Sequence, residues 1–280
     1  MILMMSRDKV RREGRFPVNV GAFALTLSVL LPLLTGFTTV NPATDEREVI
    51  FISPEKERAM GKRFHGRVLK HFDMPVDPLL EEKVKGIGEE LAEVSDRKEI
   101  IYTFTVLNHD KDRFYNAFAA PGGYVYIFDD LVNALEDEGQ IASVLAHEMG
   151  HIEAKHAIKR FQGDIGATLL MLLGMNMNKE TGDFQKANRA LGQLMSEYSR
   201  SDEEQADLLA VKYMKASGFD PEEAVNALKK MQELRKKGPR RKYSSYRTHP
   251  YYSERISYIE KQIKGHMDFD AYINIVSQER

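Results

Sequence analysis

The stretch 144–152 (VLAHEMGHI) contains the residues of this chain with the clearest capacity for chemistry. His147 and His151 are four residues apart, so on a helix they stand on one face with Cβ atoms about 5–6 Å apart. Both rings can then reach one metal ion at roughly 2.0–2.1 Å, the bond length of zinc to histidine. Glu148 points in a neighbouring direction, where its carboxylate can take a proton from a water molecule beside the metal. The spacing therefore predicts one zinc ion per chain and hydrolysis of a peptide bond.

Two histidines leave a zinc ion short of protein ligands, so a third ligand has to come from elsewhere in the chain. Ala154 and Ala157 stand where a metzincin carries its glycine and third histidine. Among the later glutamates, Glu153 is expected on the wrong face of the same helix, and Glu180 lies in a polar stretch. The better candidate is Glu203.

Residues 199–207 (SRSDEEQAD) predict the start of a helix that carries this ligand. Ser201 and Glu204 match the spacing of a capping box. Glu203 and Asp207 then stand on one face, at i and i+4. Glu203 can bind the metal, while Asp207 can accept the free N–H of a ligand histidine and so fix its tautomer.

Helices are the main elements that have to position these side chains. The metal-binding helix is predicted from about Glu138 past His156, with Asp137 as its N-cap. Gly150, between the base and the second histidine, would let another backbone or a substrate come close. Two further helices, at about 54–72 and 78–95, each open with a proline after a capping residue.

A small sheet is predicted beside the helices, which makes the fold α+β and mostly helical. Ile100–Leu107 and Tyr124–Phe128 are rich in β-branched and aromatic residues, as strands are. The small-residue stretch 116–123 (NAFAAPGG) precedes the second of these strands. It is either a strand that pairs with an extended substrate through backbone hydrogen bonds or an ordinary hairpin.

The N-terminal segment predicts export. Five basic residues precede Phe16, and no charged residue follows until after Thr44. The apolar part, about Val18 to Val40, is long enough to span a hydrocarbon core of about 30 Å. We therefore expect residues 1–44 to be a signal peptide or an N-terminal membrane anchor and residues 45–280 to be one catalytic domain. The catalytic part would lie in the periplasm or on the outer face of the inner membrane. The alternative is a buried N-terminal core helix.

Composition excludes several other functions. The formal charge of −2 gives no basic excess for nucleic acid, so protein or peptide substrates are expected. The chain has no cysteine, which excludes thiolate zinc ligands, thiol catalysis and disulfides. A second apolar run at 165–177 is too short to cross a bilayer unaided. We expect it to be a buried core helix, with a flap over the cleft or a membrane interface as alternatives.

Four motifs, AAPGGYVYI, HEMGH, SRSDEEQAD and THPYYSER, follow one another in the chain in an order that resembles one family. The sequence is similar to the HtpX and CAAX-prenyl-protease family of zinc metallopeptidases, most closely its BepA- and LoiP-type members, over about residues 50–265. The resemblance implies a mostly helical zincin fold with a small sheet. BepA-type members also carry a C-terminal helical-repeat domain, which this chain is expected to lack.

The resemblance also assigns roles to individual residues. It implies that zinc is bound by His147, His151 and Glu203, that Glu148 is the base, and that Asp207 contacts a zinc ligand without binding the zinc itself. The family's more usual ExEAD has Gln205 at its third position here, and this departure is expected to affect neither Glu203 nor Asp207.

Two residues of the THPYYSER motif are further candidates. The matching histidine in BepA-type proteins can occupy the fourth zinc position and exclude water, which implies that His249 is a fourth ligand or gate. Six residues on, Arg255 is a candidate for stabilising the developing oxyanion.

The sequence thus supports two functions. The first is a zinc endopeptidase of the cell envelope that acts on misfolded or extended protein segments in protein quality control. The alternative is a chaperone-like binding protein with a closed, non-catalytic zinc site. Glu148 favours the enzyme, because a structural zinc site has no need of a base.

Overall fold

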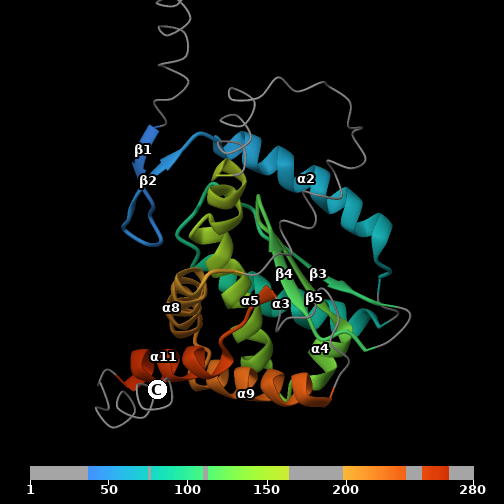
Figure 1. Cartoon of the computed structure of the whole chain (residues 1–280). Coiled ribbons are helices and arrows are strands. Elements are labelled where there is room, and N and C mark those ends of the chain that lie inside the picture. Colours follow the sequence, from blue (N-terminus) through green and yellow to red (C-terminus); the bar gives the residue numbers. More distant parts are fainter. Residues whose placement is uncertain (1–36, 75–76, 110–112, 164–197, 238–247, 265–280) are drawn as a thin grey trace, which may run out of the picture. The chain divides into compact units, whose positions relative to one another are not determined.

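The computed structural model describes residues 37–74, 77–109, 113–163, 198–237 and 248–264. The chain divides into two units, Met1–Phe37 and Thr38–Arg280, and the second contains the predicted site. Figure 1 labels the helices and strands of the described residues. The described elements are β1 (Phe37–Val40), β2 (Arg47–Ile50), α2 (Pro54–His71), α3 (Pro78–Glu93), β3 (Thr103–Leu107), β4 (Ala117–Ala120), β5 (Tyr124–Phe128), α4 (Asp129–Ala134), α5 (Glu138–Glu153), α8 (Arg200–Ala216), α9 (Glu222–Lys237) and α11 (Tyr252–Lys264).

Helices α2 and α3 begin where their capping residues and prolines predict. The Ser53 side chain accepts a hydrogen bond from the backbone N–H of Lys56 at the start of α2. Asp77 does the same for Leu79 at the start of α3. Since proline at the first helical position lacks only an N–H that would have no partner, both starts are defined locally. The two predicted helices are confirmed.

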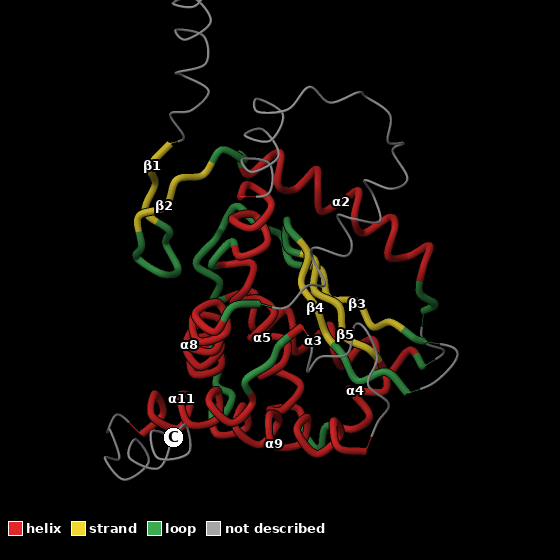
Figure 2. The backbone as a smooth tube through the Cα atoms, in the orientation of Figure 1, coloured by secondary structure: helices red, strands yellow, loops and turns green. Residues whose placement is uncertain are grey.

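The predicted small sheet has three strands in the order β3-β5-β4 (Figure 2). Strands β3 and β5 are parallel, whereas β4 and β5 are antiparallel and joined by the turn 121–123. Gly122 and Gly123 both have positive φ, which a tight turn of this kind requires. The small-residue stretch is therefore a hairpin strand, and within the described chain it is also an edge strand of the sheet.

The end of the apolar N-terminal segment enters the second unit. Its last four residues form β1, which pairs with β2. The Asn41 side chain donates to the backbone carbonyl of Glu153, so this hairpin is attached to the end of α5. Among the described residues, no helix is both long and apolar enough to cross a bilayer. The segment up to residue 36 and the apolar run 165–177 lie outside the described residues.

Helix α5 is the central element of the second unit (Figures 1 and 2), and it contacts α3, α8, α9 and β4. Every residue from Gln140 to Glu153 is buried. The Asp137 side chain caps its start, as predicted, by accepting from the backbone N–H of Gln140. The prediction that the helix runs past His156 is wrong. It ends at Glu153, and Lys155 takes a left-handed conformation with a φ of 57°.

Candidate metal centre

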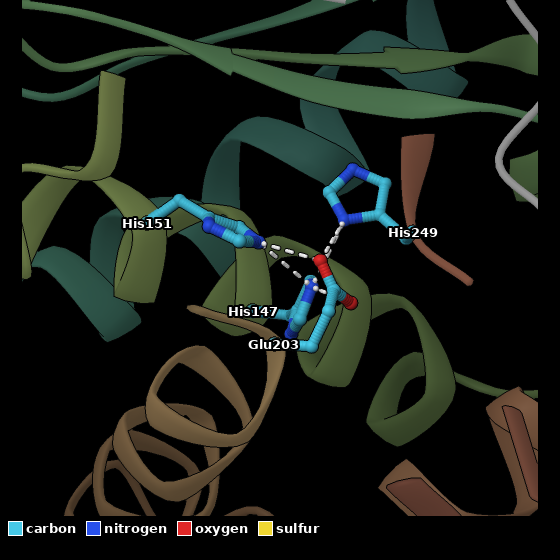
Figure 3. A group of neighbouring side chains, drawn as sticks. All are labelled: His147, His151, Glu203 and His249. Atoms are coloured by element: carbon cyan, nitrogen blue, oxygen red, sulfur yellow. Dashed lines mark hydrogen bonds and ion pairs between the residues drawn. The ribbon is translucent and has the colours of Figure 1, made fainter. Parts of the chain in front are cut away.

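The two motif histidines lie on one face of α5 as their spacing predicts. Their Nε2 atoms are 3.1 Å apart and both are buried (Figure 3). Two unprotonated ring nitrogens repel each other at this distance, so they need a shared proton or a cation between them. The side chain of Glu153 points elsewhere, where it accepts from Ser95, the backbone of Arg97 and Tyr102.

Helix α8 brings Glu203 to these histidines. A Cβ at Gly150 would lie 2.7 Å from the carbonyl oxygen of Ala206, so only glycine lets α8 pack this closely on α5. The carboxylate oxygens of Glu203 then lie 3.5 Å from His147 Nε2 and 3.5 Å from His151 Nε2. The close helix approach that Gly150 permits therefore assembles the cluster.

The cap of α8 differs from the one predicted. The N-cap is Ser199, whose side chain accepts from the backbone N–H of Asp202 while the Asp202 carboxylate accepts from the backbone N–H of Ser199. The predicted pair, Ser201 and Glu204, is wrong by two residues. Glu203 nevertheless faces the histidines, because its place relative to Asp207 on the helix does not depend on where the helix starts.

His249 completes a cluster of four. Its Nδ1 lies 3.0 Å from Glu203 Oε1 and 3.3 Å from His147 Nε2. One donor atom from each of the four residues falls within 4.8 Å of the others. In a tetrahedral zinc site with bonds of roughly 2.0–2.1 Å, ligand atoms are about 3.3–3.4 Å apart. The observed separations of 3.0 to 3.5 Å fit that geometry, so these residues can hold a metal ion.

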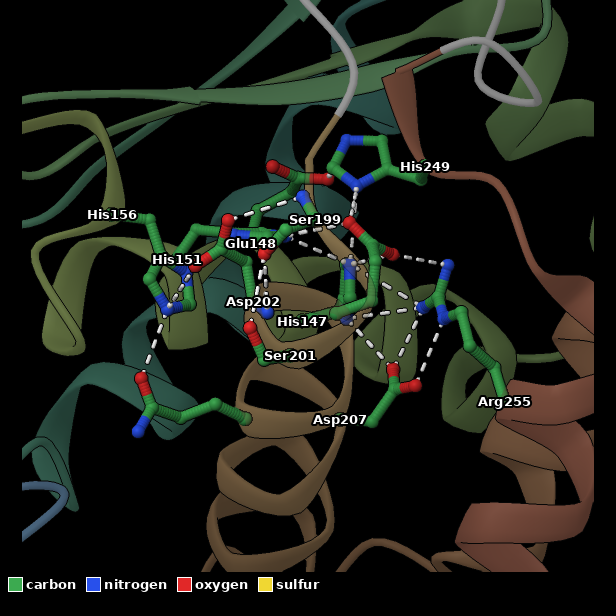
Figure 4. Close-up of polar contacts among 12 residues, drawn as sticks. His147, Glu148, His151, His156, Ser199, Ser201, Asp202, Asp207, His249 and Arg255 are labelled. Carbon is green, nitrogen blue, oxygen red and sulfur yellow. Dashed lines mark hydrogen bonds and ion pairs between the residues drawn. The ribbon is translucent and has the colours of Figure 1, made fainter. Parts of the chain in front are cut away.

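Asp207 and Arg255 lie behind His147 (Figure 4). The Nδ1 of His147 is 2.9 Å from Asp207 Oδ1, as predicted for a carboxylate that fixes a histidine tautomer. Arg255 donates twice to the Asp207 carboxylate, at 2.8 and 2.7 Å. Its remaining nitrogen, Nη1, lies 2.8 Å from Glu203 Oε2. The guanidinium is thus placed to orient two carboxylates of the site, and its role at an oxyanion stays a prediction.

These charges shift the pKa values of the cluster. Burial and Arg255 lower the pKa of His147, but the neighbouring carboxylates outweigh them and raise it to about 9. Burial holds the pKa of His151 well below its ordinary value. Burial alone would raise the pKa of Glu203, yet Arg255 and the histidines hold it well below its usual range. Glu203 is therefore ionised at neutral pH, as a metal-binding carboxylate has to be.

Glu148 is placed as the predicted base. It is buried, and its Oε1 lies 3.4 Å from Nε2 of His249. Its Oε2 makes no hydrogen bond to the described residues. Because a buried carboxylate oxygen without a partner is costly, this atom points to a bound molecule such as water or substrate.

Two residues that contact the cluster are not predicted from the sequence to do so. The Nδ1 of His156 lies 2.8 Å from Nδ1 of His151, and its Nε2 lies 2.9 Å from Gln205 Oε1. Gln205, the departure from the family pattern, therefore reaches the cluster through His156. Helical spacing gives no signal for this contact, because a residue five positions along a helix points away.

A buried set of histidine and carboxylate donors with a second carboxylate beside it defines the class of this protein as a metal-dependent hydrolase. The chain belongs to peptidase family M48, which matches residues 78–263. It is 26% identical over 228 residues to the Beta-barrel assembly-enhancing protease of Yersinia pestis, a match that covers 77% of this chain and 44% of that protein.

Two other relatives extend the comparison. The Beta-barrel assembly-enhancing protease of Escherichia coli strain K12 is 25% identical over 218 residues, covering 74% of this chain and 44% of that protein. The Mitochondrial metalloendopeptidase OMA1 of Saccharomyces cerevisiae is 26% identical over 236 residues, covering 79% of this chain and 67% of that protein. The chain thus spans less than half the length of the first two relatives.

Proposed function

We propose that this chain is a zinc-dependent endopeptidase that hydrolyses misfolded or extended protein segments in the cell envelope. The observation that carries the proposal is the cluster of four buried donors within 4.8 Å of one another, with the unpartnered Glu148 oxygen beside them. Imidazole and carboxylate donors in that geometry suit zinc. When bound, zinc polarises a carbonyl group and lowers the pKa of a water molecule.

The side chains divide this work. His147, His151 and Glu203 hold the metal, and Glu148 takes the proton of the attacking water and returns it to the leaving amine. Asp207 accepts the Nδ1–H of His147 and keeps that ring in one tautomer, with Arg255 fixing the carboxylate in turn.

Strand β4 offers a surface for the substrate backbone. It is the edge strand of the described sheet and contacts α5. Ala117 at its start lines the same pocket as His147 and Glu148. A peptide that pairs with this edge would be held by its backbone, which makes cleavage tolerant of sequence and selects unfolded segments.

The pocket beside Glu148 suggests which substrate side chain lies next to the cleaved bond. Val144, Leu228 and Met231 are among its apolar walls. A pocket of this lining selects an apolar side chain. A peptide mixture varied at one position should therefore be cleaved faster with leucine there than with aspartate, and equal rates would exclude the assignment.

The envelope location rests on the uncharged stretch between Phe16 and Thr44 behind a basic N-terminus. If that segment remains uncleaved, it also attaches the enzyme to the membrane. Fractionation of cells that express the full chain tests this, since recovery in the cytoplasmic fraction would contradict it.

The alternative, a chaperone-like protein with a closed zinc site, is favoured by one observation. His249 stands at the fourth position of the cluster, and a zinc ion with four protein ligands is structural rather than catalytic.

The base separates the two functions. The full chain and its Glu148→Gln variant would be compared for zinc content and casein cleavage, with Glu138→Gln, an exposed glutamate on the same helix, as the control. We expect Glu148→Gln to keep zinc and to lose at least about 100-fold in rate. If it keeps zinc and cleaves as fast as wild type, the enzyme assignment is wrong. If the wild type binds zinc and cleaves nothing, the closed site is correct.

A further inference from the structure

His156 reaches His151 because α5 ends between them. On an uninterrupted α-helix, a residue five positions on is turned about 140° away and displaced by about 7.5 Å, so its side chain could not make this contact. Here α5 ends at Glu153, and the left-handed conformation of Lys155 interrupts the helical path before a further helical stretch begins at His156. The interruption changes the direction in which His156 points and places the two Nδ1 atoms 2.8 Å apart.

The turn is held from outside the helix. A lysine gains nothing by itself from a positive φ, which L-residues rarely adopt. Lys155 forms an ion pair with the buried carboxylate of Glu48 on β2. Asn41, just before the same hairpin turn, donates to the carbonyl of Glu153 at 3.0 Å. The β1–β2 hairpin thus stabilises the conformation that brings His156 to the metal cluster.

The contact fixes the protons on both rings. If His151 binds a metal through Nε2, which faces the cluster, its proton is on Nδ1 and has to be donated. The acceptor is Nδ1 of His156, which then carries its own proton on Nε2 and donates it to the amide oxygen of Gln205 at 2.9 Å. His156 is buried, so water is poorly placed to replace it as acceptor. One hydrogen-bonded chain therefore runs from His151 through His156 to Gln205.

We propose that His156 is a positioning residue that holds His151 in its metal-binding tautomer and orientation, with Gln205 fixing the tautomer of His156. This inference rests on the proposed function, because it assumes that His151 is a metal ligand. The ring of Tyr198 stacks on the ring of His151, with centroids 3.8 Å apart, and so also restricts its orientation.

The two ligand histidines are thereby supported in different ways. His147 donates directly to the charged carboxylate of Asp207. His151 instead donates to the imidazole of His156, whose Nε2 lies 2.9 Å from the Gln205 amide oxygen and 3.5 Å from Asp202 Oδ1. The second ligand histidine is thus separated from the nearest supporting carboxylate by one ring.

Two substitutions at one position test the proposal. His156→Phe keeps the volume of a ring but removes the acceptor, whereas His156→Asn places an amide oxygen close to where Nδ1 was. Zinc affinity of the full chain would be measured by competition with a chelator, and thermal unfolding of the metal-free chain would be recorded for each variant. We expect His156→Phe to bind zinc about 10- to 100-fold more weakly. His156→Asn should recover most of that loss, while both metal-free variants unfold together.

The outcomes separate this inference from the proposed function. Wild-type affinity in His156→Phe, or no recovery in His156→Asn, overturns the positioning role while zinc binding by the wild type stands. A wild type that binds no zinc overturns the proposed function and this role with it. Two-bond ¹H–¹⁵N correlation of the histidine rings reads the protons directly in the metal-free and zinc-loaded chains. A proton on Nε2 of His156 supports the chain of hydrogen bonds, and one on its Nδ1 excludes it.

Discussion

Replacing His249 by alanine should raise the activity of the enzyme. The ring of His249 stands between the metal ligands and the base, with Nδ1 3.0 Å from Glu203 Oε1 and Nε2 3.4 Å from Glu148 Oε1. A water molecule has to lie in that position to meet both the metal and Glu148. The arrangement is therefore closed to catalysis until His249 moves away.

The magnitude follows from the population of the open arrangement. When a protein exchanges between two states that differ by a few kcal/mol, the minor state is populated at about 0.1–10%. Activity proportional to that fraction would rise about 10- to 1,000-fold if the site were always open. His249→Ala replaces the imidazole with a methyl group and leaves His147, His151 and Glu203 in place. We therefore expect at least about a tenfold increase in basal cleavage.

The assay is cleavage of casein and self-cleavage by the full chain, with zinc content measured on the same samples. His71→Ala, which replaces an exposed histidine at the end of α2, is the control for the loss of a histidine. Reduced cleavage with zinc intact would make His249 a participant in catalysis and refute the gate. An unchanged rate would show that its position in the cluster has no effect on access.

Three further predictions follow from the contacts of the site. Glu203→Ala should abolish zinc binding, whereas Glu204→Ala should leave it intact, and equal zinc loss from these two variants would contradict the assigned ligand. Asp202→Ala breaks the observed cap of α8 and should therefore destabilise the chain by about 1 kcal/mol in thermal unfolding. Asp207→Ala should retain zinc but lower its affinity about 10- to 100-fold in chelator competition, and an unchanged affinity would remove its role. Burial would raise the pKa of Glu48, but its partners, led by Lys155, hold it below the ordinary value of 4.5. The ionised carboxylate therefore stabilises the fold above pH 4.5, and this contribution is lost as the pH falls through the lowered pKa. The melting-temperature difference between wild type and Glu48→Gln should therefore shrink below about pH 4.5, and a constant difference would exclude this source of acid sensitivity.

Local signals explain why much of the fold could be predicted. The starts of α2, α3 and α5 depend on a capping side chain, and for α2 and α3 on the proline that follows, so neighbouring residues decide them. The i, i+4 spacing of His147 and His151 is likewise a property of one helix. Beyond α5, Glu203 and Asp207 were predicted from the capping pattern and helical spacing of their own segment, whereas His249 and Arg255 were predicted only from a family motif, because spacing alone cannot join that segment to α5.

The start of α8 shows where local signals stop deciding. The stretch 199–204 contains two overlapping patterns of serine followed three residues later by an acid, and either could cap the helix. The structure uses Ser199. The residue before it, Tyr198, donates its backbone N–H to the carbonyl of Thr248 at 3.1 Å. This contact joins segments about fifty residues apart in the chain and fixes where α8 begins. Which serine caps the helix therefore depends on tertiary structure.

The end of α5 escapes prediction for the same reason. Nothing in the residue types near Lys155 announces a helix end, since lysine is a good helix former and the usual glycine is absent. The left-handed turn is stabilised by Glu48, which lies more than one hundred residues earlier in the chain. His156 and Gln205 could be recognised only once that turn was known.

Charge balance gives an independent reason to place a divalent cation among these residues. Three buried carboxylates, Glu148, Glu203 and Asp207, surround the histidines, and within the described part of the site Arg255 is the buried guanidinium that faces them. With the histidines neutral and the carboxylates ionised, two negative charges remain, and leaving them unbalanced in a buried site costs several kcal/mol per ion. The raised pKa of His147 expresses the same imbalance, because the carboxylates favour a proton on its ring. A divalent ion balances the charge while the histidines stay neutral, so metal binding and proton release from His147 should be coupled.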